Sequence, residues 1–328
     1  MKILVTGAGG YIGSVLVPML LNKGHQVVAL DRFFFGEDKL PPEGQGLLVK
    51  KDDIRFVGKT IFEGVDAVVD LAALSNDPSG ELDPVKTYSI NHLGRLRIAV
   101  VARSMGVKRY ILPSSCSIYG FTDEVVNETS VINPLTVYAK ANYLAEEDIL
   151  NLADDSFCVV ILRQATVYGF SPRMRFDLAI NGMVKGFFTG GKIPILKDGT
   201  QWRPFIHVKD TSKAIISVLE SNAKLVNKQL FNVGSNEQNY QIFDLARRVA
   251  DAINIPFEYE WYGLPDLRSY RVDFSKIKNT VGFSPDYNAE KGAEEVWKAL
   301  KEGKLNPDDP MSITVQWYKK ILSEGAMV

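Results

Sequence analysis

The chain has 328 residues, of which 46% are hydrophobic and 23% are charged, a composition that excludes disordered and fibrous proteins and allows one large core or two domains around a cleft. The 38 basic and 39 acidic residues nearly cancel, which excludes the broad basic field that nucleic acids or anionic membranes attract. No run approaches the roughly 18 apolar residues of a membrane span. Two cysteines and a start without a cleavable signal predict a reducing, cytoplasmic setting and small-molecule partners.

Short β-rich runs alternate with helical patterns along the first half of the chain. In order, we expect a strand at 2–6, a helix from 11, strands at 27–30 and 67–71, a long helix within 84–105, a strand at 109–113, a helix at 137–152 and a strand at 157–162. This alternation is typical of an α/β fold in which a doubly wound parallel sheet of Rossmann type carries helices on both faces.

A glycine-rich segment, Thr6-Gly7-Ala8-Gly9-Gly10-Tyr11-Ile12-Gly13, follows the first strand and opens the first helix. In this strand–loop–helix context the pattern predicts dinucleotide binding. The glycines permit a tight turn, close approach of the backbone to a pyrophosphate, and close packing of helix on strand, while the helix N-terminus offers amide donors to phosphates. We expect cofactor contacts from Gly7, Gly10, Tyr11, Ile12 and Gly13.

Further cofactor contacts are expected at the ends of the next strands. Asp31 ends the second strand, where a carboxylate accepts from both ribose hydroxyls and repels a 2′-phosphate, so it favours NAD over NADP. Arg32 follows directly and could instead pair with a 2′-phosphate. Asp53, with Ile54, stands where a third strand should end, and it could bond the adenine amine or be a solvated loop carboxylate. The fourth strand ends in Leu71, Ala72 and Ala73, which leave room for a flat cofactor.

Two further segments carry a family pattern. Residues 109–113 run into Ser114-Ser115-Cys116-Ser117-Ile118-Tyr119-Gly120, and a helix begins with Tyr138-Ala139-Lys140-Ala141-Asn142. With the glycine loop, these segments resemble the extended short-chain dehydrogenase/reductase family, largely NAD-dependent nucleotide-sugar epimerases, dehydratases and reductases, over essentially the whole chain. The resemblance implies catalytic roles for Ser115 and Tyr138 and further cofactor contacts from Asn91, Ser114, Tyr138 and Asn142.

The chemistry explains the tyrosine and the serine. A phenol is too weak an acid to lose its proton at neutral pH, but positive charge from nicotinamide and a nearby ammonium can lower its pKa until the phenolate serves as a base. Tyr138 would then remove a proton from a sugar hydroxyl as hydride leaves the same carbon, and Ser115 would hydrogen-bond that oxygen. Without the cofactor loop, a strand-end serine and a half-buried helix tyrosine would be the simpler interpretation.

The chain departs from the family pattern at the lysine. The family has Tyr-x-x-x-Lys, whereas Asn142 stands four residues after Tyr138. Lys140 points about 200° round the helix from Tyr138 and cannot substitute. An Asn can still hydrogen-bond ribose hydroxyls, but it brings no charge. Two hypotheses stay open: a natural member with weakened or altered redox chemistry, or a lysine replaced deliberately to trap a complex.

The residues after Ser115 limit the reaction. Dehydratases of the family place an Asp-Glu or Ser-Glu pair there, and the bifunctional epimerase–reductases that make GDP-fucose place a Cys two residues after the serine. This chain has Cys116 and Ser117 instead, and Cys116 is expected to be a small core residue. The pattern therefore disfavours 4,6-dehydration and double epimerisation. It leaves oxidation or reduction at one sugar carbon, with 4-epimerisation as the reversible form.

After Gly169 the alternation changes to loops around shorter elements. We expect an NAD-binding domain over 1–168, to which later segments return, and a smaller α/β substrate-binding domain over 169–328. Arginine forks suit a diphosphate, although surface ion pairs are an equally open interpretation. The polar loop 75–80 could shape substrate choice or be a plain turn, and His207 is expected to be structural. The expected substrate contacts are Ser75, Asn76, Ser117, Thr166, Arg175, Asn181, Arg203 and Arg268.

Two classes of function remain. One is an NAD-dependent enzyme that oxidises, reduces or 4-epimerises a nucleotide-diphosphate sugar; the other is a non-catalytic regulator that binds NAD and a nucleotide sugar. Retention of Ser115, Tyr138 and the arginines favours the enzyme. We expect no metal site and no nucleic-acid or membrane partner. The resemblance also implies a homodimer that pairs the helices at 84–105 and 137–152.

Overall fold

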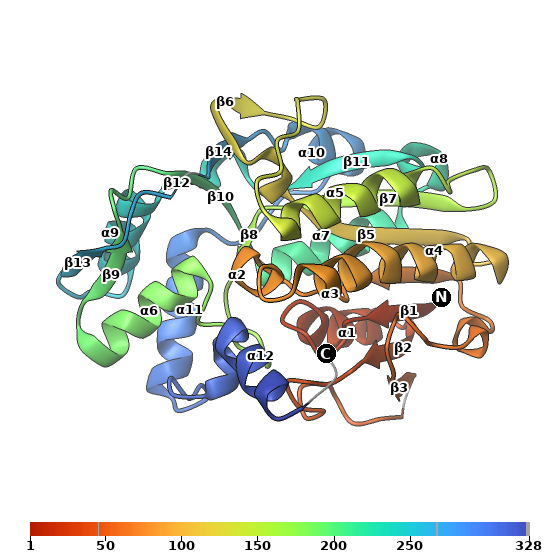
Figure 1. Cartoon of the computed structure of the whole chain (residues 1–328), viewed down its shortest axis with the longest axis horizontal. Helices are drawn as coiled ribbons and strands as arrows, with labels where there is room; N and C mark the ends of the chain where they lie inside the picture. Colours follow the sequence, from red (N-terminus) through yellow and green to blue (C-terminus); the bar gives the residue numbers. More distant parts are fainter. Residues whose placement is uncertain (45, 267, 326–328) are drawn as a thin grey trace.

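A parallel sheet of seven strands forms the centre of the computed structural model, which describes residues 1–44, 46–266 and 268–325. The strand order is β11-β7-β5-β4-β1-β2-β3, and every neighbouring pair runs parallel (Figure 1). This confirms the predicted fold class. The strands are β1 (Lys2–Thr6), β2 (Gln26–Asp31), β3 (Leu47–Lys51), β4 (Ala67–Asp70), β5 (Arg109–Ser115), β7 (Cys158–Gln164) and β11 (Gln229–Val233).

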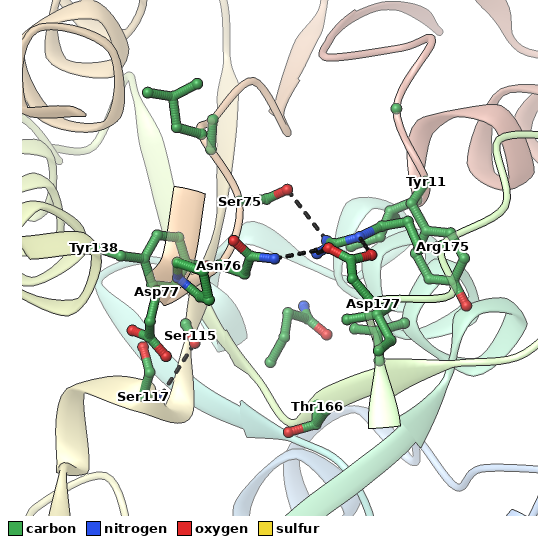
Figure 2. Close-up of a pocket in the computed structure, with 18 of the residues that line it drawn as sticks. Tyr11, Ser75, Asn76, Asp77, Ser115, Ser117, Tyr138, Thr166, Arg175 and Asp177 are labelled. Carbon is green, nitrogen blue, oxygen red and sulfur yellow. Dashed lines mark hydrogen bonds and ion pairs between the residues drawn. The ribbon is translucent and has the colours of Figure 1, made fainter. Parts of the chain in front are cut away.

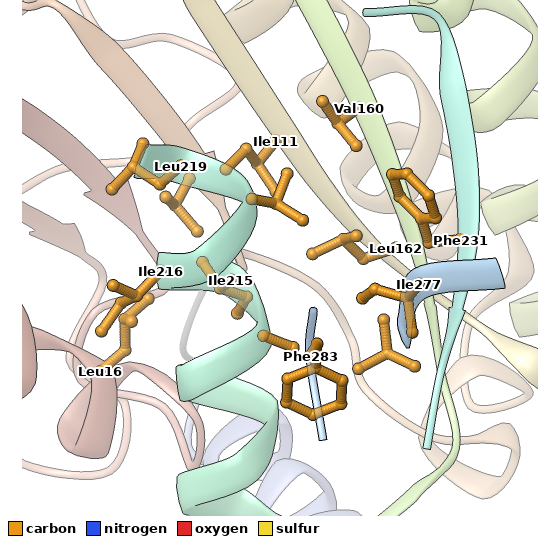
Figure 3. Packing of buried hydrophobic residues seen from close by; sticks show 14 of the residues in the cluster. Leu16, Ile111, Val160, Leu162, Ile215, Ile216, Leu219, Phe231, Ile277 and Phe283 are labelled. Atoms are coloured by element: carbon orange, nitrogen blue, oxygen red, sulfur yellow. The ribbon is translucent and has the colours of Figure 1, made fainter. Parts of the chain in front are cut away.

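Helices cover both faces of this sheet because successive strand residues point to opposite sides. Ile3 and Val5 of β1 belong to the core that contains side chains of α1 and α7, whereas Leu4 belongs to the core of α4 and α5. Figure 3 shows Ile215 and Leu219 of α7 beside the sheet residues of the first core. These helices are α1 (Gly13–Asn22), α7 (Val208–Glu220), α4 (Arg95–Ser104) and α5 (Val137–Leu150).

The long helix expected within 84–105 is interrupted. It begins as α3 (Pro84–Tyr88), passes through the π-helical segment η2 (Ser89–Gly94), and continues as α4. Single π-turns are rare and are frequent at functional sites. Within η2, the Asn91 side chain is fully buried and both donates to and accepts from the backbone of Leu74, at 3.0 and 2.8 Å. The interruption thus ties this helix to the loop that follows β4.

The second half adds small sheets and helices beside one end of the main sheet, and α7 and β11 return to the main sheet (Figure 1). None of the helices in the described ranges is long and apolar enough to cross a membrane. The added strands are β6 (Phe121–Val126), β8 (Thr166–Tyr168), β9 (Ile193–Leu196), β10 (Trp202–His207), β12 (Asn239–Gln241), β13 (Tyr259–Tyr262) and β14 (Ser269–Val272). The other helices are α2 (Asp77–Gly80), α6 (Ala179–Gly190), α8 (Ala223–Val226), α9 (Ile242–Ala252), α10 (Ser275–Val281), α11 (Ala289–Lys301) and α12 (Thr314–Ser323), with the short turns η1 (Lys59–Phe62), η3 (Cys116–Tyr119), η4 (Asn236–Gln238) and η5 (Pro310–Ser312).

The strand order places a crevice at one defined point. The chain builds outward from β1 through β2 to β3, and then from β4 in the opposite direction, so the order reverses between β1 and β4. In open α/β sheets, ligands bind outside the carboxyl ends of the strands at this reversal. The glycine loop after β1 and the small residues after β4 both lie there.

Candidate active site

One continuous cavity of about 830 Å³ lies at the carboxyl ends of the strands and is lined from both halves of the chain. It brings together 22 of the residues predicted from the sequence to bind cofactor or substrate or to act in catalysis. These are Gly7, Gly10, Tyr11, Ile12, Gly13, Asp31, Arg32, Asp53, Ile54, Leu71, Ala72, Ala73, Ser75, Asn76, Ser114, Ser115, Ser117, Tyr138, Thr166, Arg175, Arg203 and Arg268.

Three predicted contacts are not among the lining residues, and all three are buried asparagines. Asn91 is occupied by the Leu74 backbone. Asn181 donates to the hydroxyl of Tyr11 at 3.0 Å and accepts from the Gly169 amide at 2.9 Å. Asn142 accepts from a guanidinium and donates to the Tyr138 carbonyl at 3.0 Å. These amides support the wall of the cavity from behind, because their polar atoms are already paired with other parts of the chain.

The glycine loop forms the floor of the cavity at the end of β1. Gly7 has a φ of +64°, and the Gly10 amide donates to the Gly7 carbonyl at 3.0 Å. A Cβ at Gly13 would lie 2.4 Å from the Gly7 carbonyl oxygen and 2.5 Å from that of Ala8. The loop therefore folds back on the start of α1 so tightly that only glycine fits at position 13.

Substitution of Gly13 by Ala is expected to destabilise the protein by about 3 kcal/mol, because the new methyl group overpacks against rigid backbone. It should also weaken NAD binding, since the loop must open. Urea unfolding and calorimetric titration with NAD measure the two effects. Gly190→Ala is the control, because a Cβ there meets nothing within 4 Å. Equal stability of the two variants would contradict the close-packing argument.

Asp31 is held in place at the end of β2 by two backbone amides. Its carboxylate accepts from Gly9 at 2.9 Å and from Phe33 at 2.7 Å. Burial raises the pKa of Asp31, while these two hydrogen bonds work in the opposite direction. Its neighbour Arg32 contacts Asp53 at 2.7 Å. The Arg32 guanidinium, which could pair with a 2′-phosphate, thus pairs with the Asp53 carboxylate.

Asp53 is shared between two guanidinium groups. Arg32 and Arg55 contact its carboxylate at 2.7 and 2.6 Å. Burial alone would raise the pKa of Asp53, but hydrogen bonds from Arg55 and Arg32 lower this pKa to about 2. The prediction that Asp53 bonds the adenine amine stays a prediction, and the structure adds that this carboxylate also anchors Arg32.

The helix α12 closes the cavity over the cofactor end. Its Val315 and Tyr318 line the same cavity as the glycine loop. The Trp317 indole nitrogen donates to the Phe34 carbonyl at 2.7 Å, and the rings of Phe34 and Tyr318 meet edge to face. A segment after β2 and a helix near the other end of the chain therefore form one wall.

Ser115 and Tyr138 lie together on one side of the cavity, near Asp77 (Figure 2). Ser115 ends β5, and its hydroxyl accepts from the Ser117 amide at 3.1 Å. Tyr138 lies in the first turn of α5, which the Thr136 side chain caps. Burial raises the pKa of Tyr138 above 10.0, a nearby guanidinium lowers it, Asp77 raises it, and the Ser115 hydroxyl lowers it.

Arg175 faces this pair from the other side of the cavity (Figure 2). Its guanidinium donates to Asp177 at 3.0 and 2.8 Å and to the Ser75 hydroxyl at 3.2 Å. Asn76 donates to the same Asp177 carboxylate at 2.9 Å. The loop 75–80, whose later part is α2, is thereby linked to the second half of the chain. It is a wall of the cavity and more than a connecting turn.

Arg203 and Arg268 share one carboxylate at the far end of the cavity. Both guanidinium groups contact Asp266, at 2.9 and 2.8 Å, and Arg268 also contacts Asp77. The Gln164 amide, which lines the same cavity, is buried and makes no hydrogen bond within the described residues. Two arginine forks next to an unpaired amide form a polar end suited to an anionic, hydrogen-bonding ligand.

Several charged lining residues are not among the expected contacts. Asp77, Asp177 and Asp266 pair with the predicted arginines, and Arg95 and Arg173 add two buried guanidinium groups. Four of the five stand within two residues of an expected contact: Asp77 follows Asn76, Arg173 and Asp177 flank Arg175, and Asp266 precedes Arg268. Arg95 approaches from α4, where the sequence carries no such signal.

Cys116 and His207 have the structural roles expected of them. The Cys116 thiol is buried and donates to the Arg163 carbonyl at 3.2 Å, and burial raises its pKa. His207 is fully buried, stacks on Tyr287 and contacts Glu295 at 2.8 Å. Neither side chain lines the cavity.

The chain has relatives over nearly its whole length. The NAD dependent epimerase/dehydratase family matches residues 3–234, well over half of the chain. A UDP-glucose 4-epimerase of Lactobacillus helveticus is 29% identical over 340 residues, covering 97% of each protein. A protein of Bacillus subtilis (strain 168), described as the uncharacterized UDP-glucose epimerase YtcB, is 32% identical over 232 residues, covering 67% of this chain and 72% of the relative.

Solved structures agree with this relationship. MoeE5 in complex with UDP-glucuronic acid and NAD is 26% identical, with a TM-score of 0.83, and the match covers 92% of this chain and 100% of that one. MoeE5 with UDP-glucose and NAD matches with a TM-score of 0.82 over 93% of this chain. The chain therefore belongs to the NAD-dependent epimerase/dehydratase family of enzymes, with NAD as its cofactor.

Proposed function

We propose that the protein interconverts UDP-sugars that differ in configuration at C4. The observation that carries this proposal is the single cavity that contains a dinucleotide loop, the pair Ser115 and Tyr138, and two arginine forks. Relatives named UDP-glucose 4-epimerase match nearly the full chain, which supports UDP as the nucleotide and C4 as the carbon.

The residues of the chain handle the sugar hydroxyl. Ser115 hydrogen-bonds the C4 oxygen, and the Tyr138 phenolate takes its proton as the C–H bond of C4 breaks. The glycine loop and Asp31 would hold NAD, which would supply the hydride acceptor and donor for C4. Tyr138 returns the proton to the oxygen at the end. The net reaction is therefore inversion of C4 without oxidation of the sugar.

Inversion requires the 4-keto sugar to present its opposite face before hydride returns. Arg203 and Arg268 suit the diphosphate as a fixed anchor during this turn. The part of the cavity near the sugar is lined by the short polar side chains of Ser75, Ser117 and Thr166, which leave space for rotation. An anchored diphosphate and a roomy sugar site favour epimerisation over a one-way reaction.

Dehydration has less support. The two residues after Ser115 are a buried thiol and a serine, neither of which is an acid suited to expel a hydroxyl. Asp77 lies on this side of the cavity near Ser115 and Ser117 (Figure 2), where it accepts from the Thr136 hydroxyl at 2.5 Å and pairs with Arg268. The oxygens of this carboxylate are thus already paired with other side chains of the protein.

The proposal is tested by incubating the NAD-bound protein separately with UDP-glucose, UDP-galactose and UDP-glucuronic acid. Proton NMR of the anomeric region identifies the products. We expect the C4 epimer of at least one sugar to appear without accumulation of reduced cofactor. Net reduction of NAD would instead assign a dehydrogenase, loss of the C6 oxygen a dehydratase, and binding without conversion of any sugar a regulator.

Arg268→Ala is expected to raise KM for the UDP-sugar roughly ten- to hundred-fold, because a charged hydrogen-bonding partner of the diphosphate is lost. The value of kcat should change less than KM, since Arg268 is connected to the Tyr138 side of the cavity only through Asp77. Arg271→Ala is the matched control, because Arg271 donates to the Asp123 carbonyl and does not line the cavity. A large fall in kcat with unchanged KM would contradict an anchoring role.

We also propose a homodimer formed through the helices at 84–105 and 137–152. Leu93, Val100 and Leu144 are 56%, 46% and 37% exposed on η2, α4 and α5, which pack against one another. Apolar side chains gathered on neighbouring helices are typical of an interface. The Leu93→Glu/Val100→Glu variant should be monomeric by light scattering, whereas Leu225→Glu, at an equally exposed apolar side chain on α8, should not alter the mass. A dimer that survives the double substitution would rule out this face.

The buried, unpaired Cys116 and Cys158 support a reducing, cytoplasmic location. Cell fractionation tests it directly.

A further inference from the structure

A buried guanidinium stands behind Tyr138, where the side chain at position 142 alone would bring no charge. Arg95 is 2% exposed and lines the cavity from the start of α4. One of its terminal nitrogens donates to Asn142 Oδ1 at 2.8 Å. The others donate to backbone carbonyls at the ends of β4 and β5, including Ala72 at 3.1 Å and Pro113 at 3.0 Å. The guanidinium is therefore fixed in three directions.

All of these acceptors are electrically neutral. None of the ion pairs within the described ranges includes Arg95, and the acidic groups near it are occupied by other donors. Asp70 accepts from the hydroxyls of Thr6 and Tyr110, and Glu146 contacts Arg163 at 2.8 Å. A buried cation whose direct acceptors are all neutral acts on its neighbours through its field, and these neighbours include Asp70 and Glu146 as well as Tyr138.

We propose that Arg95 is the positioning residue that supplies the positive charge beside Tyr138, in place of the lysine that the family carries four residues after the tyrosine. Asn142 is the partner of this guanidinium. Its Oδ1 accepts from Arg95, while its Nδ2 is fixed on the Tyr138 carbonyl. The family's lysine on α5 is thus replaced by two residues: Asn142 at the same position on α5, and Arg95 on the neighbouring helix α4, which carries the positive charge. This inference rests on the proposed function, because it takes Tyr138 as the base.

Three charged groups on different elements act on the Tyr138 phenol through their fields. Arg95 on α4 lowers the pKa of Tyr138 against the larger effect of burial, Asp77 on α2 raises it, and Arg175 before α6 lowers it. Asp77 is paired with Arg268, and Arg175 is paired with Asp177. Arg95 is the one of these three that has no direct ionic partner among the described residues. Removing its charge should therefore raise the pH at which the phenolate forms.

The test separates the effect of the positive charge at position 95 from the effect of the side chain's size. Arg95→Met removes the charge, Arg95→Lys keeps it, and Arg95→Met/Asn142→Lys moves it back to α5. Each NAD-bound protein is titrated by ultraviolet difference spectroscopy against its own Tyr138→Phe derivative, which isolates the Tyr138 phenolate. The pH dependence of kcat is measured alongside. Because the titration needs no turnover, it tests Arg95 even if no UDP-sugar is converted.

We expect Arg95→Met to raise the pH of phenolate formation by about one unit or more and to lower kcat roughly 100-fold. Arg95→Lys should stay near the parent in both measurements, and the double variant should recover most of the loss. If the phenolate of Arg95→Met forms at the parent's pH, the proposal is overturned.

A second variant guards against misfolding, because Arg95 also joins two strand ends. Asn142→Asp keeps the size of the side chain and its acceptor for Arg95, but neutralises the guanidinium. If Arg95 had only a structural role, the carboxylate would hold its side chain as well as Asn142 does or better, and the activity would not fall. We expect instead a later phenolate titration and a lower kcat in a folded protein. An unshifted titration in Asn142→Asp would also overturn the proposal.

Discussion

Tyr138→Phe is expected to lower kcat roughly 1,000-fold, because the ring stays in place and only the group that carries the proton is lost. The remaining rate comes from holding the sugar beside the cofactor. Conversion of UDP-sugars followed by NMR gives kcat, and calorimetry gives the affinity for the same sugars. We expect affinity to change little, since the phenol is one of many polar groups in the cavity.

The same helix offers a matched control. Tyr143 lies five residues further along α5, where its hydroxyl donates to Glu147 at 2.6 Å outside the cavity. Tyr143→Phe removes an identical group and should leave kcat close to the parent value. If both phenylalanine variants were equally active, Tyr138 would not be the base and a different proton acceptor would have to be sought.

Asn142→Lys is expected to destabilise the protein by about 3 kcal/mol, because it buries a second, uncompensated positive charge against Arg95. It should also fail to raise kcat. If Asn142 simply weakened the redox chemistry, as one of the two hypotheses from the sequence holds, this lysine would instead raise kcat. The structure reverses that expectation, because the guanidinium already occupies the place where a lysine would bring its charge.

Thermal and urea unfolding measure the change in stability, and removal of the competing cation provides the control. Arg95→Met/Asn142→Lys should be more stable than Asn142→Lys alone, so the two substitutions should be strongly non-additive. A single Asn142→Lys variant that is stable and faster than the parent would show that Arg95 and position 142 act independently.

The fold and the cofactor loop were predictable because their signals are local. The continuous apolar run of β1 and the three glycines before α1 report backbone conformations and contacts within a few residues. The interruption at η2 was not predictable in this way. A π-turn depends on tertiary contacts, here those of Asn91 with the loop after β4.

The candidate site divides along the same line. Ser115 and Tyr138 line the cavity as expected, since a strand end and a first helical turn fix their directions. Two of the predicted asparagines do not line the cavity, because their side chains hydrogen-bond residues that are distant in the sequence. Asn142 bonds Arg95, 47 residues away, and Asn181 bonds Tyr11, 170 residues away. The pattern Tyr-x-x-x-Asn indicated a missing charge, but only the packing of α4 on α5 identified the group that replaces it.

The position of α12 bears on how long a cofactor stays bound. The sheet and glycine loop form a fixed wall, and the opposite wall is a helix joined to the segment after β2 by one indole–carbonyl bond and a few ring contacts. An enzyme that consumes NAD must release it in every cycle, whereas one that regenerates NAD within each cycle gains from a long residence time. A second wall that lines the cofactor end of the cavity adds contacts that favour a long residence time, which suits the second kind of catalyst.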